Sequence, residues 1–417
     1  MMLRRFSSLA TAAVLLFVGC SLPLQGYFAS VKALGMGGCG VAYPQDALAA
    51  AYNPAGMVWV GTRADLGAQM RYNDGHVVIT DSTIDNNGTF SADRGRYFAA
   101  PDVGFNWMVF DSCDVAIGAV FYTKEFFKAS YSEAFPLFGT TPLSMELWQG
   151  VLSPVFSIRF ESFSFGISAD FIGQRLKVRG MEAFDDPLFT TSPGNITNRK
   201  ESFTGGITYT LGGLYKWTKC LSIGGMWQLH AKAKHFRKYR GLVSENGELQ
   251  IPTRIVGGLY WRFAPSYGLA FDVEHISWNK VRWWHHNFPD TTDELTLNPF
   301  GSAKGPGFGW QDQTIFHVGT DIKLSQAVVF RLGYRYARSP MKKDEVLLNI
   351  LHLDTVEQDI TVGCTIDMCT AGEFSAYYSY GVQHAIKGPP IGGDFGAGSY
   401  TLVGQRHSAG LSMGWGW

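Results

Sequence analysis

Apolar and polar residues alternate with a period of two along most of this chain, which predicts β-strands. In the stretch 163–171, Phe165 and Ile167 point to one side of the backbone while Gly166 and Asp170 point to the other. The same alternation recurs at 221–228, 267–274, 330–336 and 360–367. A soluble sheet with one hydrated face also alternates in this way. The pattern therefore predicts an all-β chain without fixing its surroundings.

The lengths of the strands and of their connections distinguish a membrane barrel from a soluble sheet. The alternation predicts about fourteen strands, and many are longer than the roughly 5–6 residues usual in globular sheets. The predicted strands lie near 62–73, 97–110, 113–127, 147–161, 163–179, 201–217, 219–236, 250–264, 266–282, 310–323, 325–339, 355–367, 371–387 and 402–417. Connections of two or three residues, such as 161–162 and 324–325, alternate with long ones, such as 128–146 and 283–309. Short turns at one end and long loops at the other are typical of outer-membrane barrels, and an even strand number leaves no unpaired edge in lipid.

The two ends of the chain agree with an exported barrel. Residues 1–26 read as a signal peptide, with Arg4 and Arg5 ahead of the apolar run 9–18, and cleavage is expected after Ser21 or after Gly26. The alternative is a lipoprotein signal with Cys20 as the lipidated residue. The last strand alternates apolar residues with glycine and serine and ends on an aromatic residue. We expect the barrel-assembly machinery to recognise this strand. The sequence thus predicts a transmembrane antiparallel β-barrel over 62–417, in the outer membrane and in contact with its lipid.

Composition supports this interpretation. Aromatic residues make up 14% of the chain, there are 49 glycines, and charged residues reach only 17%, against about a quarter in soluble domains. Lys plus Arg and Asp plus Glu both number 35, which argues against a nucleic-acid partner. Six cysteines leave an odd number once a signal is removed, and their spacing matches no zinc pattern. We expect unpaired cysteines, with an intermolecular disulfide as the alternative, and a monomeric protein without metal or cofactor.

Residues 27–61 do not read as a strand. The segment is apolar, nearly uncharged and rich in glycine, including Gly35, Gly37 and Gly38, which disfavour a stable helix. Asp46 is placed to cap a short helix that begins at Ala47. The turn Asn53-Pro54-Ala55 follows. Such a segment is poorly suited to an exposed tail, so we expect a plug that packs inside the barrel.

The opening of this segment resembles the long-chain fatty acid outer-membrane transporter family, of the FadL/TodX type. Its order and spacing are matched by 33–38, 41–42, Asp46 and 53–57. Further similar stretches are 271–274 with Ser277 and Trp278, Trp310 with Asp312 and Gly319, 330–336 with Ser339 and Pro340, and Pro154 ahead of Phe156 and Ile158. The resemblance covers nearly the whole chain, although the matching residues are sparse and the long loops match nothing. The chain ends in Trp417 where the family usually ends in Phe.

The resemblance implies a fourteen-stranded barrel whose lumen is blocked by an N-terminal hatch containing the Asn53-Pro54-Ala55 turn and the hatch glycines. It also implies transport of a hydrophobic small molecule, such as a long-chain fatty acid or an aromatic hydrocarbon. The ligand would meet an apolar groove among the loops and then a pocket near the hatch. A kink in one strand would give a lateral exit. No catalytic residue is implied.

The loops contain candidates for the apolar groove, because burying apolar ligand surface is worth roughly 25 cal/mol per Å². The candidates are Phe126, Phe127, Phe135, Leu137, Phe138, Leu143, Met145, Phe184, Leu188 and Phe189, with Met181 in the same loop as the last three. The alternative is that these side chains pack the loops against one another.

Three other functions remain open from the sequence. A general polar porin would use a lumen lined by residues such as Asp272, Arg331 and Arg335, although a continuous plug argues against it. A barrel enzyme would need a nucleophile with an orienting neighbour, and none stands out near His285, His286, Asp290 or His384. A structural or adhesive barrel is the third alternative.

Overall fold

The computed structural model describes residues 28–109, 114–391, 393–395 and 398–417. The predicted signal peptide, with Cys20 and both candidate cleavage sites, lies outside the described residues, as do Tyr27 and Cys113. The described chain forms one antiparallel sheet of fifteen strands that closes on itself through β15 and β1. Because β2 pairs only with β1, the closed barrel among the described residues has fourteen strands. The predicted fold is therefore confirmed.

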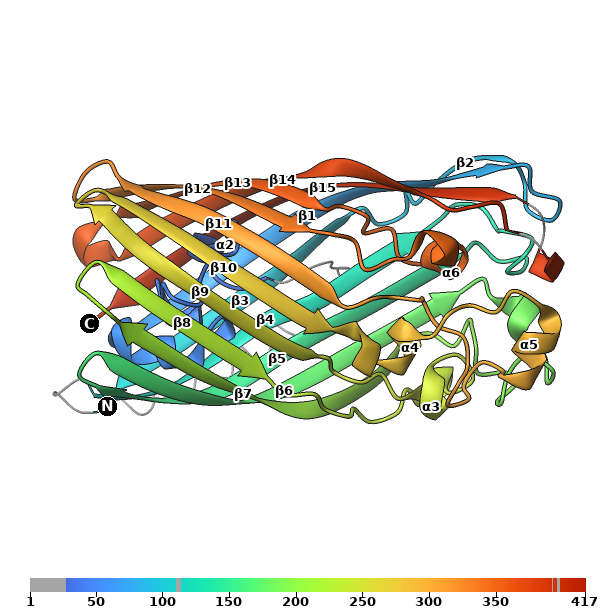
Figure 1. Ribbon diagram of the computed structural model, residues 1–417, viewed down its shortest axis with the longest axis horizontal. Coiled ribbons are helices and arrows are strands. Elements are labelled where there is room, and N and C mark those ends of the chain that lie inside the picture. Colours follow the sequence, from blue (N-terminus) through green and yellow to red (C-terminus); the bar gives the residue numbers. More distant parts are fainter. Residues whose placement is uncertain (1–27, 110–113, 392, 396–397) are drawn as a thin grey trace.

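The strands follow one another around the barrel in chain order (Figure 1). They are β1 (Arg63–Thr80), β2 (Gly88–Ser91), β3 (Tyr97–Met108), β4 (Val115–Ser130), β5 (Ser144–Phe160), β6 (Phe163–Arg179), β7 (Ser202–Lys216), β8 (Leu221–Gln228), β9 (Thr253–Ala264), β10 (Tyr267–Ser277), β11 (Gln313–Lys323), β12 (Val328–Ala337), β13 (Gln358–Asp367), β14 (Glu373–Lys387) and β15 (Ser399–Gly416). The closing ladder is long, running from Arg63 opposite Gly416 to Thr80 opposite Ser399. Closure leaves no strand edge of the barrel for lipid to solvate.

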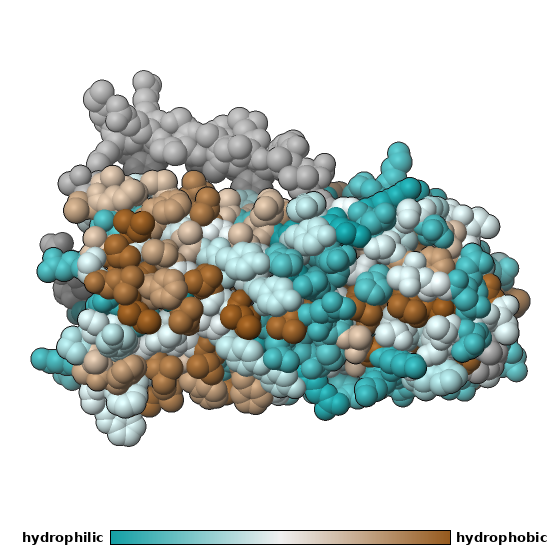
Figure 2. Space-filling model, turned by 90° about the horizontal axis from the view of Figure 1, so that it is seen from above, coloured by the Kyte–Doolittle hydropathy of each residue, from teal (hydrophilic) through white to brown (hydrophobic). Residues whose placement is uncertain are grey.

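The two faces of the sheet have opposite chemistry. Along β6, Phe163, Phe165 and Phe171 are exposed on the outside, whereas Ser164 and Asp170 are buried inside. Figure 2 shows the outward apolar side chains gathered over the half of the barrel near the short turns, with a hydrophilic belt beyond them. Apolar-out and polar-in is the arrangement of a barrel whose outer surface faces hydrocarbon. Among the described residues, no helix has the length and apolar character needed to cross a membrane.

Short helices lie within the lumen and among the long loops. The lumen holds α2 (Val31–Leu34), η1 (Ala47–Ala51) and η2 (Pro54–Trp59). The loops hold η3 (Glu182–Phe184), η4 (Arg237–Tyr239), α3 (Ser244–Gly247), η5 (Trp278–Lys280), α4 (Arg282–His285), α5 (Thr292–Leu297), η6 (Lys343–Glu345), α6 (Val346–Asn349) and η8 (Gly393–Phe395), while η7 (Cys369–Ala371) forms a short turn. In Figure 1 the loop helices gather at the end opposite to the chain termini.

Two strand ends differ from the sequence prediction by more than five residues, and the short strand β2 was not predicted. Residues 74–80 were expected in a loop, but they extend β1 and pair with β15, with Gly75 opposite Gly404. Val77 and Ile79 on this extension are fully buried against the loops, and that tertiary packing outweighs the turn signal of Asn73-Asp74-Gly75. β8 ends at Gln228 rather than near 236, and the chain beyond it makes only isolated bridges such as that of Ala231 with Ile251.

Candidate functional site

The described part of the predicted plug, residues 28–61, is called the hatch segment from here on. It packs against the inner barrel wall through α2 on β13 and β14, η1 on β3 and β4, and η2 on β5, β6 and β7. A side-chain oxygen caps each short helix, because Ser30, Asp46 and Asn53 accept hydrogen bonds from the backbone N–H groups of Ala33, Leu48 and Ala55. These caps allow short helices to form where the glycines exclude a long one.

Polar side chains on the strands satisfy the irregular backbone of the hatch segment. The Asp272 carboxylate accepts from the N–H groups of Gly40 at 2.8 Å and Val41 at 3.0 Å. The Thr361 hydroxyl accepts from Gly37 N–H at 2.9 Å, and the Asn106 amide donates to the Met57 carbonyl at 2.8 Å. Buried backbone groups need such partners, so the barrel wall supplies what regular secondary structure would otherwise provide.

Asn53 ties the predicted hatch turn to the barrel. Its amide nitrogen donates to the carbonyl oxygens of Val41 at 2.8 Å and of Gly213 in β7 at 3.0 Å. Its amide oxygen accepts from Ala55 N–H at 3.0 Å, and the Ser164 hydroxyl donates to the Ala55 carbonyl at 2.8 Å. Pro54 occupies the first turn of η2, where its lack of an N–H costs nothing. Each residue of the turn is therefore placed by hydrogen bonding or ring geometry.

Two of the hatch glycines are required by backbone conformation as well as by space. Gly37 and Gly38 have φ values of 70° and 91°, which residues with a Cβ rarely adopt. A Cβ on Gly37 would lie 2.8 Å from the backbone nitrogen of Tyr334, and one on Gly38 would lie 2.9 Å from Nδ1 of His317. These glycines let the hatch segment lie directly on β11 and β12. Gly35 has an ordinary φ and approaches Gly363 of β13.

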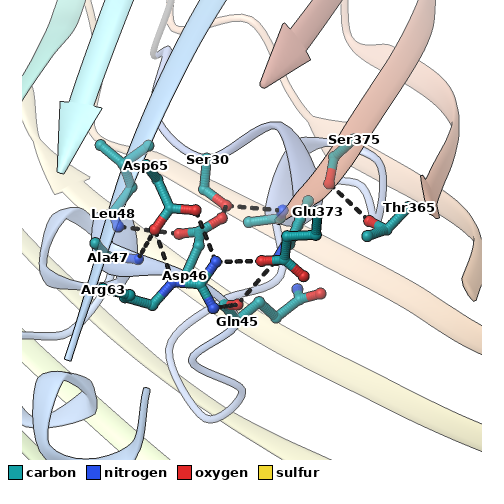
Figure 3. Close-up of polar contacts among 12 residues, drawn as sticks. Ser30, Gln45, Asp46, Ala47, Leu48, Arg63, Asp65, Thr365, Glu373 and Ser375 are labelled. Atoms are coloured by element: carbon teal, nitrogen blue, oxygen red, sulfur yellow. Dashed lines mark hydrogen bonds and ion pairs between the residues drawn. The ribbon is translucent and has the colours of Figure 1, made fainter. Parts of the chain in front are cut away.

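An ionic network fixes the hatch segment where β1 meets β14 and β15 (Figure 3). Lys32 of α2 and Arg63 of β1 both form ion pairs with Glu373 of β14. Arg63 also forms an ion pair with Asp65 at 2.7 Å. The Asp65 carboxylate in turn accepts from the Ala47 N–H at 2.8 Å. Burial raises the pKa of the adjacent Asp46 carboxyl, and the neighbouring charge of Asp65 adds to that shift. The hatch segment is thus held partly by charge.

A cavity of about 240 Å³ lies between the hatch segment and the long loops. Leu34, Gly37, Gly38 and Tyr52 form its hatch side. Toward the loops its wall is mainly aromatic and aliphatic, and includes Phe126, Phe127, Trp278, Trp310, Ile315 and Val356. His352 lies at this end with its ring 4.8 Å from that of Trp310, and burial lowers its pKa to about 4. An uncharged apolar surface therefore faces the cavity on the loop side.

The remaining cavity wall carries charges that are largely paired. Arg406 binds both carboxylate oxygens of Asp354, at 2.9 and 2.8 Å, and Arg335 lies 3.1 Å from Asp359. Arg254 forms an ion pair with Glu274. Arg71 differs from these, because its Nη1 is buried with no hydrogen-bond partner among the described residues.

Among the described residues, the Arg71 guanidinium makes one hydrogen bond and lies over two aromatic rings, of which Phe98 is the more distant at 5.9 Å. Its Nε donates to the Ser408 hydroxyl at 2.9 Å, and its Cζ lies 4.7 Å above the Phe28 ring. A buried guanidinium N–H without an acceptor is costly, so this edge of the cavity suits an anionic group supplied from outside the chain.

Among the described residues, the hydrogen-bonded ladder between β3 and β4 is interrupted beside Phe28. The ladder between β3 and β4 extends only from Met108 opposite Ala116 to Val103 opposite Phe121. β4 then has a register irregularity relative to β5 between Thr123 and Glu125. In the unpaired region the Phe28 ring packs against Phe98, with ring centroids 5.6 Å apart. The first described residue of the hatch segment thus fills a gap between two strands.

The structure separates the ten predicted groove residues into three groups. Phe126 and Phe127 line the cavity. A second group is buried within one large apolar core, with Met145 at the start of β5 and the others in the loops: Phe135, Leu137, Phe138, Leu143, Met145 and Phe184. Leu188 is 61% exposed, and Phe189 packs on the edge of that core. The loop core, referred to below as the cap, also contains Trp283 and Trp284.

The sequence reasoning missed several residues that make the site, including Thr361, Asn106, Glu373 and Arg71. Each one faces the lumen from an alternating strand, which the pattern indicates, but neither the hatch nor the cavity contacts can be read from the pattern. Four described cysteines, Cys39, Cys220, Cys364 and Cys369, have free thiols.

A closed fourteen-stranded barrel with an apolar outer surface, an internal N-terminal segment and a cavity above it defines a plugged membrane β-barrel. The chain belongs to the family of outer membrane protein transport proteins (OMPP1/FadL/TodX), whose model matches residues 25–368. This is a family of transport proteins. No curated protein sequence matches the chain.

Solved structures with the same fold come from several bacteria. The toluene transporter TodX of P. putida is similar with a TM-score of 0.66 and 16% identity, covering 94% of this chain and 100% of that one. A FadL homologue of Pseudomonas aeruginosa has a TM-score of 0.68 and 14% identity, covering 94% and 99%. The Ralstonia pickettii toluene transporter TbuX has a TM-score of 0.61 and 14% identity, covering 93% and 98%. At these identities the likeness establishes the fold.

Proposed function

We propose that this protein is an outer-membrane channel for hydrophobic compounds that carry an acidic group, such as long-chain fatty acids. The observation that carries the proposal is the cavity above the hatch segment, apolar toward the loops and bordered by the unpartnered Nη1 of Arg71. An acyl chain would lie along Phe127, Trp278 and Trp310, and its carboxylate would accept from Arg71. Neutral aromatic hydrocarbons, which the names of two similar structures mention, would use only the apolar part.

Two movements would complete the proposed path of the ligand from the loops, through the cavity, into the membrane. The cavity volume of about 240 Å³ is below the roughly 300–1,000 Å³ of sites for drug-sized ligands, so a long chain requires the cap or the hatch segment to shift. The gap filled by Phe28 between β3 and β4 is the proposed lateral exit into the membrane. Among the predicted groove residues, Phe126 and Phe127 are retained as ligand contacts, and the other eight remain a prediction for the open cap.

Uptake by cells that lack their own transporter tests the proposal. Cells with the full-length protein should take up labelled long-chain fatty acid and should not take up small sugars. Arg71→Met should lower fatty acid uptake about ten- to a hundredfold, because a charge-assisted hydrogen bond is worth roughly 1.5–3 kcal/mol. Uptake of toluene by this variant should be unchanged. Arg338→Met, at an exposed position beyond β12, is the matched control.

The outcomes separate the alternatives. Sugar uptake without lipophile uptake would replace the proposal with a polar porin, and absence of any uptake by surface-folded protein would favour a structural or adhesive barrel. Equal loss of fatty acid and toluene uptake in Arg71→Met would reject the proposal that Arg71 binds an acidic group of the ligand. The proposal of a channel for hydrophobic compounds would stand.

A further inference from the structure

Basic residues crowd the outer surface of the barrel where β6, β7 and β8 lead into the long loops. We call Lys177, Lys200, Lys232, Lys234, Arg237 and Lys238 the basic patch. Lys177 and Lys238 are neighbours, because both bond to Glu201, through its carboxylate and its carbonyl oxygen respectively, each at 2.8 Å. Lys232 and Lys234 flank the buried Ala233, which bridges to Gly206 of β7, so extended backbone directs both lysines outward.

The positive charge of this patch is poorly neutralised by the protein. Glu201 is the acidic residue within it, and it pairs with Lys177. Among the described residues, Lys232, Lys234 and Arg237 have no ion-pair partner. A surface hollow of about 560 Å³ lies between 201–204 and the residues Lys234, Arg237 and Lys238. Cations that converge on a hollow and outnumber its one carboxylate, Glu201, fit an anionic ligand.

Directly beside the patch the outer surface becomes apolar. Along the outward face of β6, Phe171 is exposed and apolar, and the basic Lys177 follows six residues later. Phe203, which is 70% exposed, lines the hollow itself, and Trp227 on β8 is also exposed. The ligand that matches this surface therefore has anionic groups at one level and hydrocarbon chains immediately below them.

We infer that the basic patch binds a phosphorylated glycolipid of the outer leaflet, the lipopolysaccharide class. Its sugar phosphates would lie among Lys232, Lys234 and Arg237, since lysine and arginine are the common phosphate-binding side chains. Its acyl chains would lie along Phe171, Phe203 and Trp227. The long-loop end, where the patch lies, is the end that faces outward in barrels of this type. This inference rests on orientation in the membrane and is independent of the transported compound.

Lipid retention by the purified full-length protein tests the inference. The protein would be incubated in detergent with bisphosphorylated lipopolysaccharide, with its dephosphorylated form, or with phosphatidylglycerol, and bound lipid counted by native mass spectrometry. The test variant is Lys232→Gln/Lys234→Gln/Arg237→Gln. The matched control is Lys219→Gln/Lys280→Gln/Lys304→Gln, which removes the same charge at exposed positions elsewhere. Heat-modifiable migration on gels verifies that each variant is folded.

The expected result is retention of bisphosphorylated lipopolysaccharide by the native protein and the control, with at least a tenfold loss in the test variant. The dephosphorylated lipid should bind weakly to all three. Equal retention by the test variant and the control would overturn the inference. Equal binding of phosphatidylglycerol and lipopolysaccharide would also overturn it, because the patch would then be selective only for negative charge. Uptake assays on the same variants should show unchanged transport.

Discussion

The backbone N–H of Phe28 donates to the carbonyl oxygen of Thr123 in β4 at 2.8 Å. Continuing the β3–β4 register by two residues would place Pro101 opposite Thr123, and proline has no N–H to donate. The hatch segment thus supplies a ladder hydrogen bond that β3 is unable to make. The integrity of the barrel wall at this point depends on the position of the hatch segment.

Removing the Phe28 ring should loosen the wall between β3 and β4. Phe28→Ala loses the packing against Phe98 and the contact with Arg71, and large-to-small core changes of this kind cost about 3–5 kcal/mol. Hydrogen exchange of the amides in 97–100, at Asp102 and in 122–127 should speed up by at least a hundredfold. Phe160→Ala, at an exposed position near a short turn, should leave these amides unchanged. Unaltered exchange in Phe28→Ala would contradict the role assigned to the ring.

Asn53→Ala should release the hatch turn from β7. The change leaves the carbonyl oxygens of Val41 and Gly213 without the Asn53 donor, at a cost of about 1–3 kcal/mol. The barrel should still fold, because its strands pair independently of the turn. Planar-bilayer recordings should show more frequent open events than in the native protein, and lipophile uptake should change. Asn86→Ala, on an exposed loop, serves as the control, and recordings indistinguishable from the native protein would refute the role of the turn.

Charge should contribute to hatch closure at the β1–β14 contact. Glu373→Gln removes the carboxylate that Lys32 and Arg63 share, leaving the buried Lys32 and the partly buried Arg63 without that partner. Channel opening should become more frequent. Opening of the native protein should also increase with salt, since partly exposed ion pairs are screened. Glu133→Gln, on an exposed loop residue, should behave like the native protein. An equal salt response in Glu373→Gln and the native protein would argue against this ionic contribution.

The cap should loosen as pH rises from about 4.5 to 7. Burial, together with the charges of Asp344 and Asp290, raises the pKa of Glu345 to about 7, against the opposing effects of the Phe288 N–H and of Lys342. A folded pKa above the ordinary value of 4.5 means that the folded cap binds this proton more tightly than the unfolded chain does. Its stabilising effect is therefore complete below pH 4.5 and is lost as pH rises through about 7.

Tryptophan quenching can follow this change. Acrylamide quenching of the cap tryptophans should increase between about pH 4.5 and 7 in the native protein. In Glu345→Gln the increase should be absent, because the amide does not titrate and still offers an oxygen to the Phe288 N–H, which the carboxylate accepts at 2.8 Å. His352 does not explain such a change, because burial lowers its pKa to about 4 and a lowered histidine pKa makes the folded state more stable, not less, as pH rises. A rise of equal size in Glu345→Gln would assign the effect to another group.

Much of the architecture could be predicted from the sequence because a membrane barrel imposes a simple code. Lipid requires apolar residues at every second position, and closure requires long strands joined alternately by short and long connections. Phe165 and Asp170 therefore reveal their sides of the wall without any knowledge of their neighbours. The plug was predictable for a related reason, since 27–61 is too apolar to be exposed and too rich in glycine to form a long helix.

The tertiary structure alone decided which partner each polar residue of the lumen binds. Asp272, Thr361 and Arg71 look equivalent in the pattern, as polar residues on inward positions. Asp272 accepts from the backbone N–H groups of Gly40 and Val41, and Thr361 bonds to Gly37. Arg71 has a nitrogen at the cavity without a partner among the described residues. These roles depend on which residues of the hatch segment lie opposite each strand. Alternation fixes the side of the wall on which a residue lies, whereas its partner there is set by contacts between residues hundreds of positions apart.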